Sequence, residues 1–327
     1  DLGVCLIDIS DDTTDIAVEH FDRLCAMATN SSLVDSSLYA QHNVKRGLRD
    51  ISGAGVLAGL TQIGEVQGQT VVEGSNVPGP GKLIYRGIGI EEIVDGFYAQ
   101  GRTGFEETAY LLLFGELPDA PELDWFSRRL AAERALSHDF IHASFLTLAS
   151  RDIMNAMAQT VLSLYVLDEN PDDTSLPNVL RQSLSLIAVF PLIAAYCYRA
   201  HVYRFGNSNL VIRPPRAELS AAGNFLHMLR EDGAFTALEE RLLDLALVLH
   251  AEHGGGNNSS FTTHVVTSSG TDTYSAITAA LGSLKGPRHG GANIKVVQMF
   301  DDLKRNVEDW TDDAQIERYL QQLLAKE

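Results

Sequence analysis

Residues 249–293 read LHAEHGGGNNSSFTTHVVTSSGTDTYSAITAALGSLKGPRHGGAN and contain two glycine clusters separated by a helical pattern. Between the clusters, apolar residues recur with the spacing of one helix face, at Ala276, Ile277, Ala280, Leu281 and Leu284. Asp272 is placed to cap this helix at its start, and Gly286-Pro287 is placed to end it. The stretch therefore predicts a helix followed by a glycine-rich turn.

A second apolar pattern precedes the first glycine cluster and predicts another helix, which ends at Gly254–Gly256. Its repeating residues are Leu242, Leu245, Ala246 and Leu249. His253 and His289 then each follow a helix end, beside glycines that allow a ligand to approach the backbone closely. We expect a polar site there, within an otherwise apolar helical protein.

Composition narrows the class of protein and of partner. A chain of 327 residues with 45% hydrophobic residues is long enough for one large core or two domains. The formal net charge of −18 argues against nucleic acid and against an anionic membrane as main partners. Cys5, Cys25 and Cys197 are widely spaced and form no CxxC motif, so we expect neither disulfides nor a zinc site, and a cytoplasmic location.

No targeting or membrane segment is expected. The longest apolar run, Leu184–Ala195, covers about 12 residues and contains Pro191, so it is too short to span a bilayer and predicts a kinked core helix. The first residues, DLGVCLIDISDD, lack the basic region of a signal peptide.

The remaining chain predicts an all-α, mainly helical fold with a small β-hairpin near the N-terminus. The hairpin is expected from β-prone runs at Thr70–Val72 and Lys82–Tyr85, on either side of a turn at Glu73–Gly81. Helical patterns occupy Glu106–Phe114, Leu123–Leu136, Ile153–Val166, Leu184–Arg199 and Val307–Leu324.

The pair HAEHGGGNNSSFTTH and GSLKGPRHGGAN resembles the paired signature of the citrate synthase family. Similar segments occur in the family's order at Gly81–Gly87 (GKLIYRG), Gly104–Pro118 (GFEETAYLLLFGELP) and Asn224–Leu229 (NFLHML). The resemblance implies a large helical domain at residues 1–288 and the start of an incomplete small domain at residues 289–327.

The resemblance also implies a reaction of the tricarboxylic acid cycle, in which acetyl-CoA, oxaloacetate and water give citrate and CoA. No metal or tightly bound cofactor is implied, because coenzyme A is part of a substrate. Family members are homodimers. Ile153–Val166 and Leu184–Arg199 are candidates for that interface, or for the core, and we favour the core.

Four positions take roles from the resemblance. His289 matches the histidine that donates a hydrogen bond to the thioester oxygen, which requires a neutral imidazole, and a helix start near Ala292 would favour that neutral form. His253 matches the oxaloacetate-binding histidine. Asn257 and Ser259 lie at offsets found in some members, where the serine orients the thioester-binding histidine. Apart from these four, Lys285 and Arg288 flank His289 and are candidates for contacts with the CoA phosphates, although a basic residue at a helix end is ordinarily a partner of the helix dipole.

Taken without the resemblance, these residues have plainer interpretations. His289 follows Gly-Pro as a turn histidine does, and His253 could face the last carbonyls of a helix. Together with His250 and His264 they suggest zinc, but HAEH is not HExxH and no suitably spaced carboxylate follows, so we expect no metal.

Two catalytic motifs of the family have no counterpart here. The second catalytic histidine belongs to a GHxVY-like motif and the catalytic aspartate to a DFYSG-like motif, both after HGGAN, yet no histidine follows His289. Condensation needs a base and an acid, so we expect a truncated chain that does not catalyse alone. The alternatives are a 2-methylcitrate synthase using propionyl-CoA and a non-catalytic helical dimerisation module.

Overall fold

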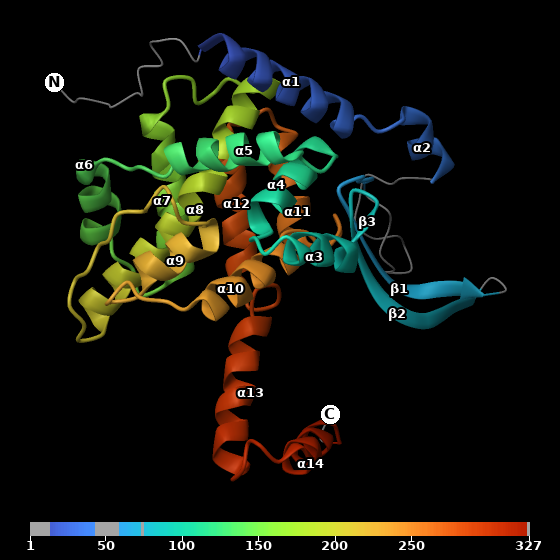
Figure 1. Cartoon of the computed structure of the whole chain (residues 1–327), viewed down its shortest axis with the longest axis vertical. Helices are drawn as coiled ribbons and strands as arrows, with labels where there is room; N and C mark the ends of the chain where they lie inside the picture. Colours follow the sequence, from blue (N-terminus) through green and yellow to red (C-terminus); the bar gives the residue numbers. More distant parts are fainter. Residues whose placement is uncertain (1–13, 43–58, 73–74, 326–327) are drawn as a thin grey trace.

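The computed structural model describes residues 14–42, 59–72 and 75–325 and is mainly helical, as the sequence predicts (Figure 1). The first part comprises α1 (Thr14–Ser32), α2 (Ser36–Gln41), β1 (Gly64–Val72), β2 (Ser75–Tyr85), β3 (Ile88–Gly89), α3 (Ile90–Ala99), α4 (Phe105–Phe114) and α5 (Ala120–Ala132). The second comprises α6 (His138–Ile141), the π-helix η1 (His142–Thr147), α7 (Ile153–Ser163), the 3₁₀ helix η2 (Leu164–Leu167) and α8 (Leu176–Phe205). The last comprises α9 (Ala221–Leu229), α10 (Ala237–Leu249), α11 (Asn258–Thr267), α12 (Thr273–Lys285), α13 (Ala292–Asn306) and α14 (Asp313–Leu324).

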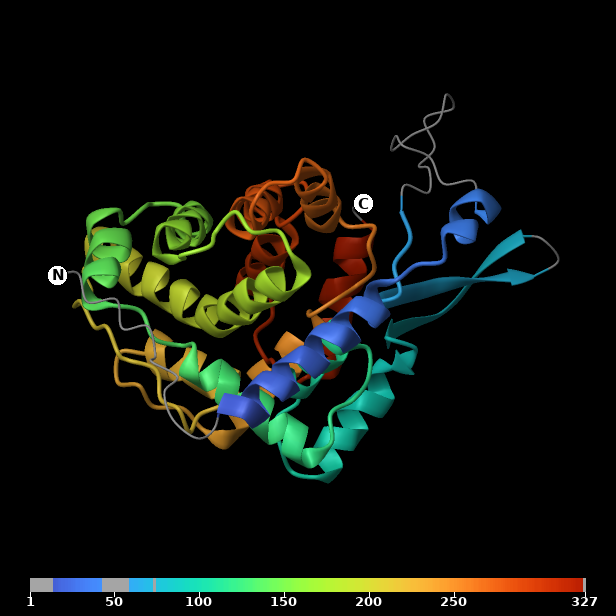
Figure 2. The same cartoon turned by 90° about the horizontal axis from the view of Figure 1, so that it is seen from above.

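Helix α8 is the central element of the core. It contacts α1, α5, α7, α9 and α12, which surround it when the molecule is seen from above (Figure 2). Leu184 and Ala188 belong to one apolar cluster with α4 and α5, while Leu192 and Ile193 belong to a second cluster with α7 and α12. One helix therefore joins two parts of the core.

Helix α8 continues through Pro191, as predicted, and it is longer than the pattern Leu184–Arg199 because it extends at both ends. With 30 residues it is long and apolar enough to cross a membrane, the one such helix in the described part of the chain, although the sequence expectation was that no run reaches this length. Its buried polar residues Gln182 and Arg199 bond to loop carbonyls of the same chain, as in a core helix.

The hairpin near the N-terminus is confirmed, with a second strand that is longer than expected. Strands β1 and β2 pair antiparallel from Gly64↔Tyr85 to Val72↔Ser75, so most of the predicted turn is strand. The register shifts between Gln67 and Gln69, where Gly68 faces residues 79–81 of β2, and this bulge in β2 contains Pro80. The hairpin extends away from the helices, with its base against α3 (Figure 1).

Helix α12 begins and ends as predicted, whereas α10 differs. The Asp272 side chain accepts a hydrogen bond from Ser275 N, and Gly286 follows the last residue of α12. Helix α10 ends at Leu249, before the glycines, and Leu242 and Leu249 are exposed rather than packed. Its inner face instead contains Asp244, whose buried carboxylate binds the start of α4.

The last two helices form a separate cluster. Helix α13 runs away from the helical body and α14 folds back against it (Figure 1). Leu303, Val307 and Tyr319 form their apolar contact. The division into domains at residues 1–288 and 289–327 stays a prediction.

Candidate active site

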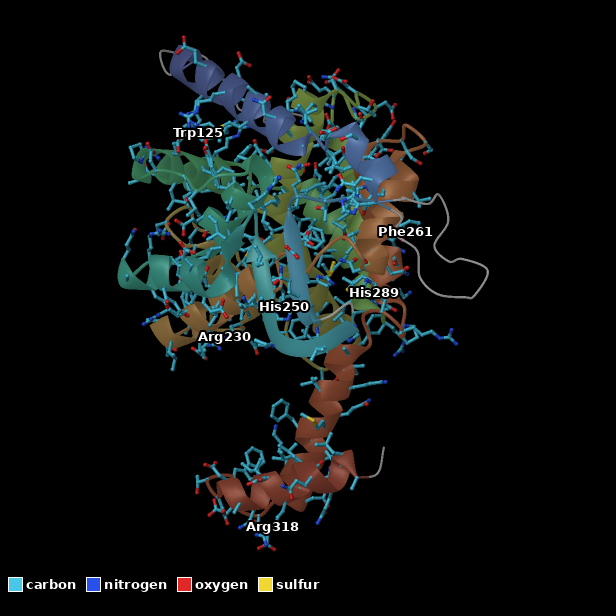
Figure 3. The ribbon with its side chains drawn as sticks, turned by 90° about the vertical axis from the view of Figure 1, so that its right-hand side faces the viewer. Trp125, Arg230, His250, Phe261, His289 and Arg318 are labelled. Carbon is cyan, nitrogen blue, oxygen red and sulfur yellow. The ribbon has the colours of Figure 1, made fainter. Side chains whose placement is uncertain are left out.

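His289 lies in the turn between α12 and α13, at the end of the body where α13 departs (Figure 3). The backbone N–H of His289 donates to Gly286 O at 2.9 Å. A Cβ atom on Gly290 would come within 2.1 Å of Leu284 O, and one on Gly291 within 2.2 Å of Pro287 O. The turn itself therefore requires glycine at both positions. The expected approach of a ligand to the backbone is a separate reason for glycine here, and it stays a prediction.

Ser259 lies in the first turn of α11 and contacts the His289 ring. The distance from Ser259 Oγ to His289 Nε2 is 2.8 Å, and the same hydroxyl is 3.1 Å from Ala280 O. The hydroxyl has one proton for two acceptors. If it donates to Nε2, a neutral His289 carries its proton on Nδ1; if it donates to Ala280 O, Nε2 must donate to Ser259. A neutral His289 can therefore donate to another group only through Nδ1, and only when the Ser259 hydroxyl donates to Nε2.

Asn257 caps α11 and so presents Ser259. Its side-chain oxygen accepts from Ser260 N at 2.8 Å, and its amide nitrogen donates to Ser260 Oγ at 2.9 Å. Asn258 Nδ2 donates to Ser283 Oγ at 3.0 Å, which ties the start of α11 to the end of α12. These bonds bring the helix start of the first motif to the turn of the second.

His253 lies in the loop between α10 and α11, a few residues before Asn257. Its side chain is exposed, and its backbone N–H donates to Glu252 Oε1 at 2.9 Å. His250, at the end of α10, lies on the same side of the body as His289 (Figure 3). His253 thus lies in the loop that leads into α11, and it is Ser259 of α11 that contacts His289.

The two basic candidates differ in their surroundings. Lys285 Nζ forms an ion pair with Asp152 Oδ2 at 3.1 Å. The Asn155 N–H and the Lys285 ammonium hold the pKa of Asp152 below its usual range, and Asp152 also caps α7. Arg288 is exposed in the turn beside His289. Lys285 thus anchors the end of α12, and Arg288 is the cation open to a ligand.

The other histidines show no metal-binding geometry. His250 Nδ1 lies 2.7 Å from Ala246 O, and His264 is exposed on α11. Within residues 14–42, 59–72 and 75–325, no three His, Cys, Asp or Glu side chains gather as metal ligands would.

Tyr85 was not singled out from the sequence, although it lies inside the GKLIYRG segment. Its hydroxyl lies 2.8 Å from Val248 O and 2.9 Å from Glu252 O, at the base of the His253 loop. The feature that could have pointed to it in the sequence is its position as a tyrosine at the end of a predicted strand. Its partners are distant in sequence, so only the fold identifies them.

An apolar cavity of about 700 Å³ lies elsewhere, between α4, α7, α8, α9, α10 and α12. Phe105, Leu186, Phe190 and Leu247 are among its lining residues. None of the predicted site residues lines it, so the cavity and the His289 turn are separate features.

Comparison with known proteins agrees with the paired motifs. A family described as "Citrate synthase, C-terminal domain" matches residues 51–327. The citrate synthase of Deinococcus radiodurans is 37% identical over 235 residues, which are 72% of this chain and 57% of that protein. The 2-methylcitrate synthase of Shewanella oneidensis is 31% identical over 254 residues, 78% of this chain and 63% of that protein.

A solved structure shows the same fold. The crystal structure of citrate synthase from Pyrobaculum aerophilum superposes with a TM-score of 0.64 at 32% identity, covering 79% of this chain and 61% of that one. The chain thus spans 57% to 63% of the length of these relatives.

Proposed function

Because the chain belongs to the citrate synthase family, we propose that the gene product condenses acetyl-CoA with oxaloacetate. The acetyl methyl carbon bonds to the keto carbon of oxaloacetate, and water then cleaves the thioester, which releases citrate and CoA. The observation that carries this proposal is the 2.8 Å contact of Ser259 Oγ with His289 Nε2, since it joins the two motifs in one site.

His289 is the proposed hydrogen-bond donor to the thioester oxygen. That oxygen gains negative charge as the methyl group loses a proton, so a donor aimed at it stabilises the transition state. The proposed role requires the Ser259 hydroxyl to donate to Nε2 rather than to Ala280 O, because the proton of a neutral imidazole then lies on Nδ1 and is free for the substrate.

His253 and Arg288 are the proposed contacts to the anionic substrates. Oxaloacetate and coenzyme A are both anions, and the chain carries a formal net charge of −18, so binding needs local cations and donors. His253 would bind oxaloacetate and Arg288 the CoA phosphates. Asn257 contributes by capping α11, and Lys285 is already paired with Asp152.

The proton-transferring acid and base are not proposed from this chain. The histidine and aspartate motifs that supply them in the family have no match after Asn293. We propose that the 327-residue chain alone does not turn over, whereas a gene product that contains both motifs does. The assay is therefore made on both.

A 2-methylcitrate synthase is the second candidate, because relatives of 31–32% identity have that name. Propionyl-CoA differs from acetyl-CoA by one methylene, which a hydrophobic pocket discriminates by about 1–3 kcal/mol. Steady-state CoA release with each thioester decides between them. A higher kcat/KM for propionyl-CoA would overturn the citrate assignment.

A homodimer in the cytoplasm is the proposed assembly and location. Leu184–Arg199 is largely buried within the monomer, so α8 is mostly core. Exposed apolar side chains occur instead on α7–η2 and on α11, at Leu162, Val166 and Val265. These exposed apolar side chains, on helices that both pack against α12, support the proposed dimer contact. Sedimentation equilibrium with Val166→Asp tests it; an unchanged mass would count against this surface.

A further inference from the structure

We propose that Tyr85 is a positioning residue that holds the His253 loop, residues 250–256, in the conformation that binds oxaloacetate. The inference rests on the proposed function for the role of His253, and it rests on geometry for the role of Tyr85. The proposal makes the end of β2, within the GKLIYRG segment, part of the site, whereas the two histidine motifs do not include this strand.

The Tyr85 hydroxyl lies at the point where α10 ends and the loop begins. It is 2.8 Å from Val248 O, 2.9 Å from Glu252 O and 3.3 Å from Leu249 O, and it accepts a hydrogen bond from Glu252 N at 3.2 Å. Burial raises the pKa of Tyr85, so the hydroxyl keeps its proton and can donate to one of these carbonyls. Glu252 is thus bound through its N–H, while the single hydroxyl proton is shared among its carbonyl and those of Val248 and Leu249.

Glu252 passes this constraint on to His253. Its carboxylate accepts the His253 N–H at 2.9 Å. Its side chain also packs tightly on β1, because a Cβ atom added to Gly64 would lie 2.5 Å from Glu252 Cγ. The residue before His253 is therefore held by strand β1 on one side and by the Tyr85 hydroxyl on the other.

Tyr85 itself is rigidly placed. The side chain is 0% exposed and packs with Phe97, Leu111 and Val248. The next residue, Arg86, donates from its guanidinium to Leu112 O at 2.7 Å and to Ser31 O at 2.9 Å. The hydroxyl is thus fixed relative to α1, α3 and α4, and it can fix the loop in turn.

A plain helix-capping role would predict a different result from a positioning role. If the hydroxyl only stabilises the end of α10, Tyr85→Phe lowers stability and leaves substrate affinity unchanged. If it positions the loop, Tyr85→Phe raises the KM for oxaloacetate by about tenfold, with a smaller change in kcat, as loss of one buried hydrogen bond allows.

The matched control is Tyr196→Phe. Tyr196 is also buried, and its hydroxyl donates to a backbone carbonyl, Arg213 O, at 2.7 Å, but it belongs to the cluster around α7 and α9. We expect this variant to keep the wild-type KM for oxaloacetate. Kinetics are measured on the gene product at a temperature where all variants are folded.

A double-mutant cycle identifies the path. Effects of residues that act through one another are not additive. With His253→Ala as background, Tyr85→Phe should change the KM for oxaloacetate by less than twofold. A full tenfold effect in that background would overturn the proposal, as would an unchanged KM in the single variant.

Hydrogen exchange on the 327-residue chain tests the proposal without requiring catalytic activity. Amides 250–256 should exchange at least about tenfold faster in Tyr85→Phe than in Tyr196→Phe, while amides of α12 stay as protected as in wild type. Equal exchange in the two variants would overturn the proposal. If exchange changes as expected but wild-type gene product releases no CoA, the proposed function fails and the loop-holding role of Tyr85 stands.

Discussion

Ser259 Oγ lies 2.8 Å from His289 Nε2, which joins the first turn of α11 to the turn after α12. The contact brings together two glycine-rich motifs that are separated by two helices in the chain. It also gives the imidazole a defined neighbour on one nitrogen, so the other nitrogen can face a substrate.

Removing the Ser259 hydroxyl should slow catalysis more than it weakens binding. Ser259→Ala leaves His289 Nε2 without that partner, so the ring can rotate and change tautomer. We expect kcat of the gene product to fall by about tenfold or more, because the donor to the thioester oxygen is misplaced. Ser259→Thr, which retains a hydroxyl, is the control and should recover part of the rate. Wild-type kcat in Ser259→Ala would contradict the orienting role.

Asp244 should make stability depend on pH in an unusual direction. Burial raises its pKa to about 6, although Gly104 N and Phe105 N donate to its carboxylate. The folded protein therefore holds this proton more tightly than the unfolded chain. The contribution of Asp244 to the unfolding free energy is greatest near pH 4 and is lost as the pH rises through about 6, by about 1–3 kcal/mol.

Urea unfolding between pH 4 and pH 7 measures this effect against Asp244→Asn. The asparagine cannot titrate, so the effect of the substitution itself on the unfolding free energy is the same at every pH. The difference in unfolding free energy between the two proteins should therefore change across this interval. The other carboxylates are common to both. Parallel pH profiles would show that the pKa of Asp244 is not raised.

Lys285 and Arg288 should respond differently to neutralisation. Lys285 is paired with Asp152, while Arg288 is exposed beside His289. Arg288→Met should weaken CoA binding by about three- to tenfold and reduce its dependence on salt, because an exposed cation is lost. Lys285→Met should change CoA affinity little and stability by less than about 1 kcal/mol, since the ion pair is half-exposed. Calorimetric titration of CoA tests both, and a larger loss with Lys285→Met would reverse the assignment.

Gly290 and Gly282 provide a matched pair of glycines. Gly290→Ala places Cβ 2.1 Å from Leu284 O, so the turn must shift and both stability and activity should fall. Gly282 lies inside α12 with nothing within 4 Å of a Cβ, so Gly282→Ala should stabilise the protein by about 0.5–1 kcal/mol. Thermal unfolding measures both. A tolerated Gly290→Ala would show that the turn is not as tight as described.

The sequence predicted correctly those features that depend on residues within a single helix. Helix α12 has its cap at Asp272 and its end at Gly286, as expected, since caps and breakers act locally. The inner face of α10 was predicted only in part: Leu245 packs against the core, but the buried carboxylate of Asp244 also lies on this face and binds the start of α4. A hydrophobic pattern has no means of showing such a polar contact.

Contacts between distant elements were beyond the sequence. The positions Ser259 and His289 were predicted from the family motifs, but their distance depends on how α11 packs on α12. The role of Tyr85 depends on the end of β2 meeting the end of α10, far along the chain. These contacts are set by tertiary packing, which no local pattern encodes.

The most direct test of the central claim is oxaloacetate-dependent release of free CoA thiol from acetyl-CoA, with citrate identified as the second product. The wild-type gene product should release one CoA per citrate. His289→Ala should lose at least about a hundredfold in rate, and His138→Ala, an exposed histidine on α6, should keep the wild-type rate. A wild-type gene product that releases no CoA, or a His289→Ala variant as fast as wild type, would contradict the account.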